Sequence, residues 1–166
     1  SIESVSKVWN ACGLRIGALV TDNQVMFDKV RSEYTANLCA NVIGQYIFGA
    51  IGNLSPQKIV EWYKIQRAYY LETIIDLVKG LEQELPGLII SKPKASIYII
   101  LDFSSITPDY FNISKFIEYC AKYGISIHNN KKYTLLLSPM SGFFTTEISG
   151  SKLARIALVE PKDKMK

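Results

Sequence analysis

The N-terminal segment brings together a lysine, an arginine and several small hydroxyl side chains. It reads Ser-Ile-Glu-Ser-Val-Ser-Lys-Val-Trp-Asn-Ala-Cys-Gly-Leu-Arg-Ile-Gly, which places Ser4, Ser6 and Lys7 a short way before Arg15. A lysine amine can bond a carbonyl carbon as a Schiff base, while serine hydroxyls and a fork-shaped guanidinium can bind the oxygens of a phosphate beside it. The segment is therefore a candidate for covalent chemistry on a phosphate-bearing ligand. From the residues alone an alternative stays open, in which Lys7 and Arg15 are surface charges that flank a strand.

A second candidate is Arg155, near the end of the sequence. It lies inside the apolar run Leu-Ala-Arg-Ile-Ala-Leu-Val at 153–159. A charged side chain in such a strand costs free energy unless it is paired, so the pattern indicates an anionic ligand or a buried partner. The alternative is an arginine that faces solvent on an edge strand.

Composition narrows the class of protein. The chain has 166 residues, of which 48% are hydrophobic and only six are proline, and its net charge is 19 − 15 = +4. Enough apolar surface is available to offset chain entropy, which excludes a disordered tail and a collagen-like fibre. Both signs of charge are interleaved, so we expect no nucleic-acid partner. The uncharged stretch 34–57 contains several Asn and Gln amides, which argues against a membrane span.

The cysteines indicate a compartment. Cys12, Cys39 and Cys120 are too few and too widely spaced for a disulfide framework or a metal-binding clip. No basic region followed by an apolar stretch resembles a secretory signal. We therefore expect a reducing, cytoplasmic location and no bound metal.

Hydrophobic periodicity and turn residues predict an alternation of strands and helices. The clearest helix begins at Ser55 and Pro56 and stops at Pro86 and Gly87, because helix-start and helix-stop residues mark its two ends. At about 1.5 Å per residue it would be roughly 45 Å long, enough to bridge two domains. Gly124 is expected to end a later helix in a left-handed conformation. Further helices are expected at 24–52, broken near 31–37, and at 112–123, and strands at 14–21, 95–103, 134–137 and 153–159. This order indicates an α/β or α+β fold.

Both candidate segments resemble one family. The N-terminal segment is similar to the lysine signature of class I and II pyridoxal-phosphate aminotransferases, which has the form small-x-small-Lys followed by Gly-x-Arg-apolar-Gly. The segment around Arg155 is similar to a strand of the same family that reads roughly Arg-Ile-Ala, and Pro-Met-Ser-Gly-Phe-Phe at 139–144 resembles the loop before it.

The resemblance implies roles for particular residues. Lys7 would form the Schiff base with pyridoxal 5′-phosphate and move the substrate proton. Ser4 and Arg15 would hold the cofactor phosphate, with Ser6 as a weaker candidate. Arg155 would grip the α-carboxylate of the substrate in a bidentate pair.

The resemblance also implies a fold and a domain organisation. The chain would be the C-terminal part of the fold type I transferase fold, an α/β architecture, with the end of the large domain followed by the α+β small domain. Residues 1–54 would be the remnant of the large domain, 55–90 the long interdomain helix and 91–166 the small domain. In this family further cofactor-binding residues precede the lysine and a closing helix follows the last strand. We therefore expect a fragment, truncated at both ends, that is inactive by itself.

The implied function is amino-group transfer between an amino acid and a 2-oxo acid, in the style of aspartate aminotransferases, by a homodimeric full-length enzyme. Two alternatives stay open. A lyase of the same fold, such as a C–S β-lyase or an aminocyclopropane-carboxylate synthase, shares the lysine and arginine signatures. The chain could also be a non-catalytic fragment that only associates with its missing half.

Overall fold

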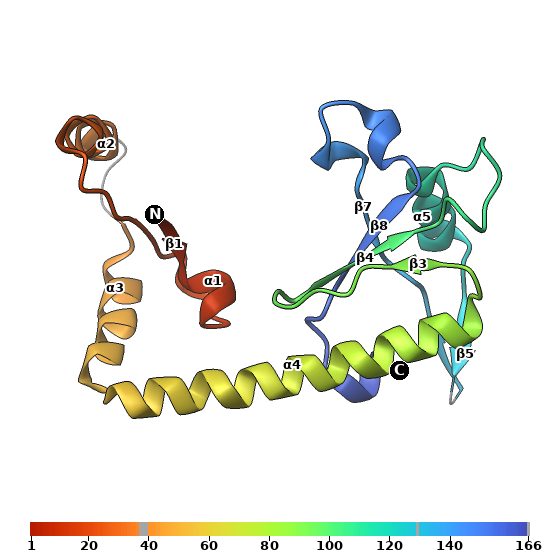
Figure 1. The fold of residues 1–166 in the computed structure, drawn as a ribbon, viewed down its shortest axis with the longest axis horizontal. Helices are drawn as coiled ribbons and strands as arrows, with labels where there is room; N and C mark the ends of the chain where they lie inside the picture. Colours follow the sequence, from red (N-terminus) through yellow and green to blue (C-terminus); the bar gives the residue numbers. More distant parts are fainter. Residues whose placement is uncertain (37–39, 129, 166) are drawn as a thin grey trace. The chain divides into compact units, whose positions relative to one another are not determined.

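The structure is a computed structural model that describes residues 1–36, 40–128 and 130–165. Strands and helices are interspersed along the chain, as Figure 1 shows, in agreement with the expected α/β class. The chain divides into two units, Ser1–Ile65 and Gln66–Lys166. The boundary between them lies inside the long helix α4 (Pro56–Glu84).

The first unit contains a small antiparallel sheet. β1 (Ile2–Ser4) pairs with β2 (Gly17–Leu19), and this register places Ser4 opposite Gly17. The segment that joins them folds into two short helical turns, α1 (Val5–Val8) and the 3-10 turn η1 (Cys12–Leu14). The helical elements that follow β2 are α2 (Gln24–Ala36), α3 (Val42–Gly49) and the 3-10 turn η2 (Ala50–Asn53).

Helix α4 begins and ends where cap chemistry predicts. The Ser55 hydroxyl accepts a hydrogen bond from the Lys58 N–H at 3.4 Å, and Pro56 takes the first helical position, where its missing N–H costs nothing. Pro86 and Gly87, the latter at φ +91°, follow its end. In the second unit the apolar side chains of α4 pack against the core of the sheet; they are Tyr70, Ile74, Leu77, Val78 and Leu81.

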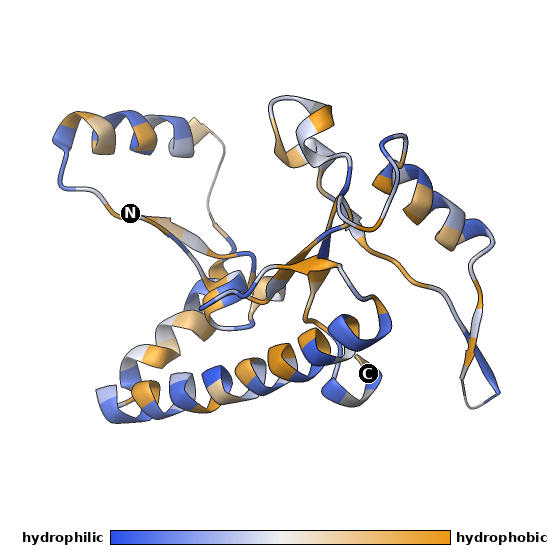
Figure 2. Cartoon of the chain, turned by 45° about the vertical axis from the view of Figure 1, so that its right-hand side comes forward, coloured by the Kyte–Doolittle hydropathy of each residue, from blue (hydrophilic) through white to orange (hydrophobic). Residues whose placement is uncertain are grey.

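The second unit is built on a four-stranded antiparallel sheet. Its order is β3-β4-β8-β7, where the strands are β3 (Ile89–Ile90), β4 (Tyr98–Asp102), β8 (Leu153–Ala157) and β7 (Ser138–Pro139). Figure 2 colours much of the ribbon of this sheet as hydrophobic. The buried core cluster contains Leu88, Ile99, Leu101, Phe103, Ile113, Ala154 and Leu158.

Helix α5 (Ile113–Lys122) covers this core, and Asn112 caps it by accepting a hydrogen bond from the Lys115 N–H at 3.1 Å. The remaining elements of the unit are β5 (Ser126–His128), β6 (Lys131–Tyr133), and the 3-10 turns η3 (Ser141–Phe143), η4 (Glu147–Gly150) and η5 (Lys162–Lys164).

Several predicted elements differ from the structure. The strand predicted at 14–21 is reduced to β2, because Leu14 belongs to η1 and Arg15 is left-handed at φ 53°. The strand predicted at 134–137 is wrong: that segment pairs with β8 only from Ser138 onward. Within residues 134–139, only Ser138 and Pro139 have register partners on β8, namely Arg155 and Ala154.

Smaller corrections concern the helices. The predicted break at 31–37 falls later, since α2 continues to Ala36, and residue 37 lies outside the described residues. Gly124 does not adopt the expected left-handed conformation. Glycine is required there for close packing, because a Cβ would lie 2.8 Å from the Cα of Cys120. The β5–β6 hairpin and β3 were not predicted, because strands of three residues or fewer carry no periodic signal.

Candidate active site

The predicted lysine site is built on the connection between β1 and β2. Ser4 is the N-cap of α1, and its hydroxyl accepts a hydrogen bond from the Ser6 N–H at 3.2 Å. Val5 fixes the turn, since its side chain is only 3% exposed and its N–H donates to the Ile16 carbonyl at 3.2 Å. Lys7 lies in the last turn of α1 with its side chain exposed.

Arg15 is positioned by strained backbone and by helix α3. Its φ of 53° and ψ of 40° are left-handed, a conformation that is costly for any residue with a Cβ. One guanidinium nitrogen, Nη1, donates to the Cys12 carbonyl at 3.2 Å. The Asn41 amide links the preceding residue to α3: its Nδ2 donates to the Leu14 carbonyl, and its Oδ1 accepts from the Gly44 N–H, both at 3.2 Å.

Close packing holds the same loop against α3. Gly44 is buried, and a Cβ there would lie only 2.7 Å from the Leu14 carbonyl oxygen. The N-terminus of α3 thus fixes the backbone immediately before Arg15.

Four of the predicted site residues therefore share one loop. Ser4 is the last residue of β1. The segment that joins β1 to β2 contains the other three, Ser6, Lys7 and Arg15. The Arg15 side chain is exposed and hydrogen bonds through Nη1 to Cys12, which leaves further guanidinium donors to face a ligand. A primary amine, a guanidinium and two hydroxyls on the same β1–β2 connection are the donor set that a phosphate-bearing aldehyde requires, so these residues fit pyridoxal phosphate.

A small cavity of about 340 Å³ lies on another face of α1. Val5, Val8 and Trp9 line it, together with Ser4 and the aromatic rings of Phe48 and Tyr63, whereas Lys7 and Arg15 do not. The lysine therefore belongs to a different side of the helical turn from this apolar cavity.

An aromatic cluster adjoins the cavity. The Trp9 ring stacks on Trp62 with centroids 5.1 Å apart and 21° between the planes, and Tyr63 lies 5.1 Å from Trp9. Partial burial raises the pKa of the Tyr63 phenol, and the negative charge of Glu3 raises it further. This cluster anchors the residue that follows α1 to helix α4.

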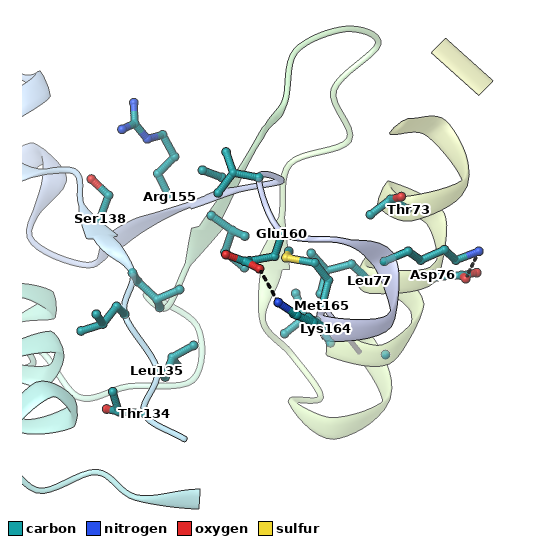
Figure 3. A pocket seen from close by; sticks show the side chains of 18 of the residues that line it. Thr73, Asp76, Leu77, Thr134, Leu135, Ser138, Arg155, Glu160, Lys164 and Met165 are labelled. Carbon is teal, nitrogen blue, oxygen red and sulfur yellow. Dashed lines mark ion pairs between the residues drawn. The ribbon is translucent and has the colours of Figure 1, made fainter. Parts of the chain in front are cut away.

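Arg155 lies on β8 in the second unit, and β8 is an inner strand between β4 and β7. The alternative of an edge-strand arginine is therefore wrong. The neighbouring residue Ala154 is fully buried in the core, so Arg155 occupies the opposite face of the sheet, where its register partners are Ile100 and Ser138. Figure 3 shows its side chain pointing away from Leu77 and Met165.

Two aromatic rings surround the Arg155 guanidinium. Its central carbon lies 4.3 Å from the ring centroid of Tyr98 and 4.8 Å from that of Phe143. The Nε atom is buried and has no hydrogen-bond partner. None of the ion pairs found among the described residues involves Arg155. A cation held by aromatic rings and not neutralised by a carboxylate suits an anionic ligand.

Arg155 is also among the residues that line a larger cavity of about 1060 Å³, together with residues of α4, β8 and the segment at 134–139. Two ion pairs lie at its rim: Lys162 bonds Asp76 at 2.9 Å, and Lys164 pairs with Glu160 at 3.6 Å, as Figure 3 shows for the latter. The hydrogen bonds that the Lys162 ammonium donates to the Glu72 and Asp76 carboxylates raise the pKa of Lys162.

Sequence reasoning missed the residues that position the two arginines. Asn41 carried a signal, since an Asn before an apolar run is a typical helix N-cap. Phe143 stood in the quoted loop without a role. Tyr98 could not be identified, because its place beside Arg155 depends on the β4–β8 register.

Two other kinds of feature are absent from the described part of the chain. No cluster of three His, Cys, Asp or Glu side chains there is arranged to hold a metal ion. None of the helices described combines the length and the apolar character that a membrane crossing needs. Cys12 and Cys120 are free thiols, and Cys39 lies outside the described residues.

Comparisons with known proteins agree with one another. The model of the family "aminotransferase class I and II" matches residues 1–151, a span that contains Lys7 and Arg15 and ends before β8. Among solved structures, the chain is similar to a multiple substrate aminotransferase from Thermococcus profundus, with a TM-score of 0.63 and 22% sequence identity. The similarity covers 99% of this chain and 37% of that one. No curated protein sequence matches the chain.

Proposed function

The chain belongs to the family of class I and II aminotransferases, and from this premise we propose that the protein of which it forms part transfers amino groups between an amino acid and a 2-oxo acid, with pyridoxal 5′-phosphate as coenzyme. The proposal extends to the whole protein because the chain spans only 37% of the length of its structural neighbour. The observation that carries it is the β1–β2 connection, which brings Ser4, Ser6, Lys7 and Arg15 into one loop.

The proposal gives each of these side chains a role in binding or in proton transfer. When bound, pyridoxal phosphate supplies an electron sink that stabilises negative charge at the substrate Cα. Lys7 would hold the coenzyme through Nζ, and the same amine would take up and return the Cα proton. The Arg15 guanidinium and the Ser4 hydroxyl, with Ser6 as a weaker contributor, would bind the phosphate oxygens. Arg155 would bind the α-carboxylate and so orient the Cα–H bond.

The proposal also covers the domain organisation, the substrates, the oligomeric state and the location of the protein. We assign the chain to the C-terminal part of a fold type I enzyme with 1–54 in the large domain, 55–90 as the interdomain helix and 91–166 as the small domain, and we propose aspartate-like substrates. A homodimer is supported by the exposed apolar side chains of α3, which are Val42, Ile43, Tyr46 and Ile47. A reducing, cytoplasmic location is supported by the free thiols of Cys12 and Cys120.

The role of Lys7 can be tested directly on the chain. Pyridoxal phosphate is added, the bound form is reduced with borohydride, and peptides are analysed by mass spectrometry. We expect the label on the peptide that contains Lys7 and its loss in Lys7→Ala, because no other amine shares a loop with Ser4 and Arg15 in the described structure.

The matched control is Lys29→Ala, on the exposed helix α2, which should label as the unmodified chain does. Labelling spread over surface lysines and unchanged in Lys7→Ala would exclude the proposed role.

A further inference from the structure

We propose that Tyr98 and Phe143 are positioning residues that hold the Arg155 guanidinium so that only its terminal nitrogens can bind a carboxylate. This inference rests on the proposed role of Arg155 as the carboxylate-binding residue. It adds two residues to that role and specifies the binding geometry.

The sheet places Tyr98 beside Arg155. In the β4–β8 register Arg155 is opposite Ile100, and Tyr98 is opposite Ala157. Tyr98 is therefore the diagonal neighbour of Arg155 on the same face, a spacing that a long side chain and an aromatic ring can span. The distance of 4.3 Å between the guanidinium carbon and the ring centroid is well inside the range of a cation–π contact.

The loop before β8 supplies the second ring. The Met140 N–H donates to the Leu153 carbonyl at 3.0 Å, and the Phe143 N–H donates to the Met140 carbonyl at 2.9 Å, which ties η3 to the start of β8. Gly150 allows this close seating, since a Cβ there would lie 2.6 Å from the Met140 carbonyl oxygen. Phe143 is 58% exposed, so this ring contributes little to the core and its contact with Arg155 is not a by-product of core packing.

The two rings determine which donors stay accessible. All five N–H donors of a guanidinium lie in its plane, and an aromatic ring attracts the cation through its face. The Nε atom is buried and unpartnered, so a ligand cannot reach it without displacing the side chains around it. The side chain as a whole is half-exposed, which leaves the two Nη groups to form an end-on bidentate pair with a carboxylate.

Immobilising the guanidinium before the ligand arrives has a consequence for affinity. A free arginine side chain loses rotamer freedom when it binds an anion, whereas one already held between rings loses less. Removing either ring should therefore weaken carboxylate binding although neither ring touches the carboxylate.

The geometry can be tested by NMR on the full chain labelled with ¹⁵N, through the Nε–Hε signals of its arginines. The Arg155 signal should be shifted upfield by the ring currents and should exchange slowly with water, because Nε is buried. In Tyr98→Leu and Phe143→Leu it should move towards the signals of the exposed arginines and exchange faster. Tyr98→Phe keeps the ring and should keep the wild-type signal. An Arg155 signal that matches those of the exposed arginines in the unmodified chain would overturn the inference.

The effect on binding is measured by titrating the same samples with pyruvate, with pyruvamide as the uncharged control. Loss of one cation–π contact should raise the Kd for pyruvate about 3- to 30-fold in each Leu variant, and Tyr98→Phe should restore it. Thermal unfolding checks that each variant is folded. Phe143→Leu is the variant least expected to disturb folding, because Phe143 is exposed. Wild-type Kd values in both Leu variants would refute the positioning role while leaving Arg155 as the binding residue. A Kd that Arg155→Ala does not change would instead refute the proposed function of Arg155.

Discussion

Arg15 and Arg155 are both proposed to bind an oxyanion, but their guanidinium groups are positioned in different ways. Arg15 is exposed on strained backbone at φ 53° and is directed by one hydrogen bond to Cys12. Arg155 lies on a regular inner strand and is directed by two aromatic rings. Strain at a non-glycine residue persists only when the surroundings impose it, and it concentrates at functional positions. We therefore expect the identity of residue 15 to matter more for binding than for stability.

Replacing Arg15 with Gly should separate these two contributions. Glycine adopts φ 53° without the cost of about 1 kcal/mol that a Cβ imposes there, so the unfolding midpoint should stay the same or rise. Binding of pyridoxal phosphate, followed by absorbance, should weaken about tenfold or more, since a charge-assisted phosphate contact is lost. Pyridoxal without the phosphate serves as the control ligand and should bind both chains equally. Equal loss of affinity for both ligands would show that Arg15 does not contact the phosphate.

The raised pKa of Tyr63 is a second property of a single residue that can be measured. The only tryptophans of the chain, Trp9 and Trp62, both contact the Tyr63 ring, and a tyrosinate quenches tryptophan fluorescence. Because burial raises this pKa above 10.0, stability from the neutral phenol is present below pH 10 and is lost as the pH rises through the folded-state value. Fluorescence should therefore fall with a midpoint above that of an exposed tyrosine, and Tyr63→Phe should remove this step. Identical titrations of the two chains would contradict the assignment.

At the scale of elements, the sequence predicts the long helices better than the strands. Both α4 and α5 carry cap residues at Ser55 and Asn112 and a periodic apolar face, which are local signals. The strands are two to five residues long; the longest, β4 and β8, lie inside the runs predicted at 95–103 and 153–159, whereas β3 and β7, with two residues each, are too short to show an alternating pattern. Where the pairing of the segment after β6 with β8 begins, at Ser138, is decided by tertiary structure and has no local sequence pattern.

The candidate site also contains residues that a local sequence pattern identifies and residues whose positions depend on tertiary structure. Lys7 and the residues near it are contiguous in sequence, so a local motif groups them, and the structure places them on the connection between β1 and β2. The left-handed backbone of Arg15 and the ring contacts of Arg155 have no sequence signature, because they depend on Asn41 and Tyr98, which lie far away in the chain. Their proposed roles in binding stay predictions.

Helix α3 offers a matched pair of substitutions that tests how it positions the Arg15 loop. Gly44→Ala places a Cβ 2.7 Å from the Leu14 carbonyl oxygen, whereas Gly49→Ala on the same helix meets nothing within 4 Å. We expect Gly44→Ala to destabilise by about 1–3 kcal/mol and Gly49→Ala to be neutral or stabilising by up to about 1 kcal/mol. Urea unfolding followed by tryptophan fluorescence measures both, and equal effects would show that α3 does not pack against the loop.

At the scale of the whole molecule, the two units differ in how much they bury. The second unit has a contiguous cluster that includes Ile99 and Ile113 with no exposed surface. In the first unit, among the described residues, only Val5 and Gly44 are buried, and the exposed side chains of α2 and α3 include many apolar ones. Burial of apolar surface is the main favourable contribution to folding. We therefore expect the first unit to be less stable than the second.

The unfolding of the chain should consequently occur in two steps. Tryptophan fluorescence, which reports only Trp9 and Trp62 in the first unit, should change at a lower urea concentration than the amide hydrogen exchange of β4 and β8. Ile99→Ala should shift only the second transition, by about 2–5 kcal/mol, because a fully buried side chain leaves a cavity. Exposed Ile43→Ala on α3 is the control and should leave the second transition unchanged. Coincident transitions by the two probes, both shifted by Ile99→Ala, would show instead that the first unit unfolds together with the core of the second.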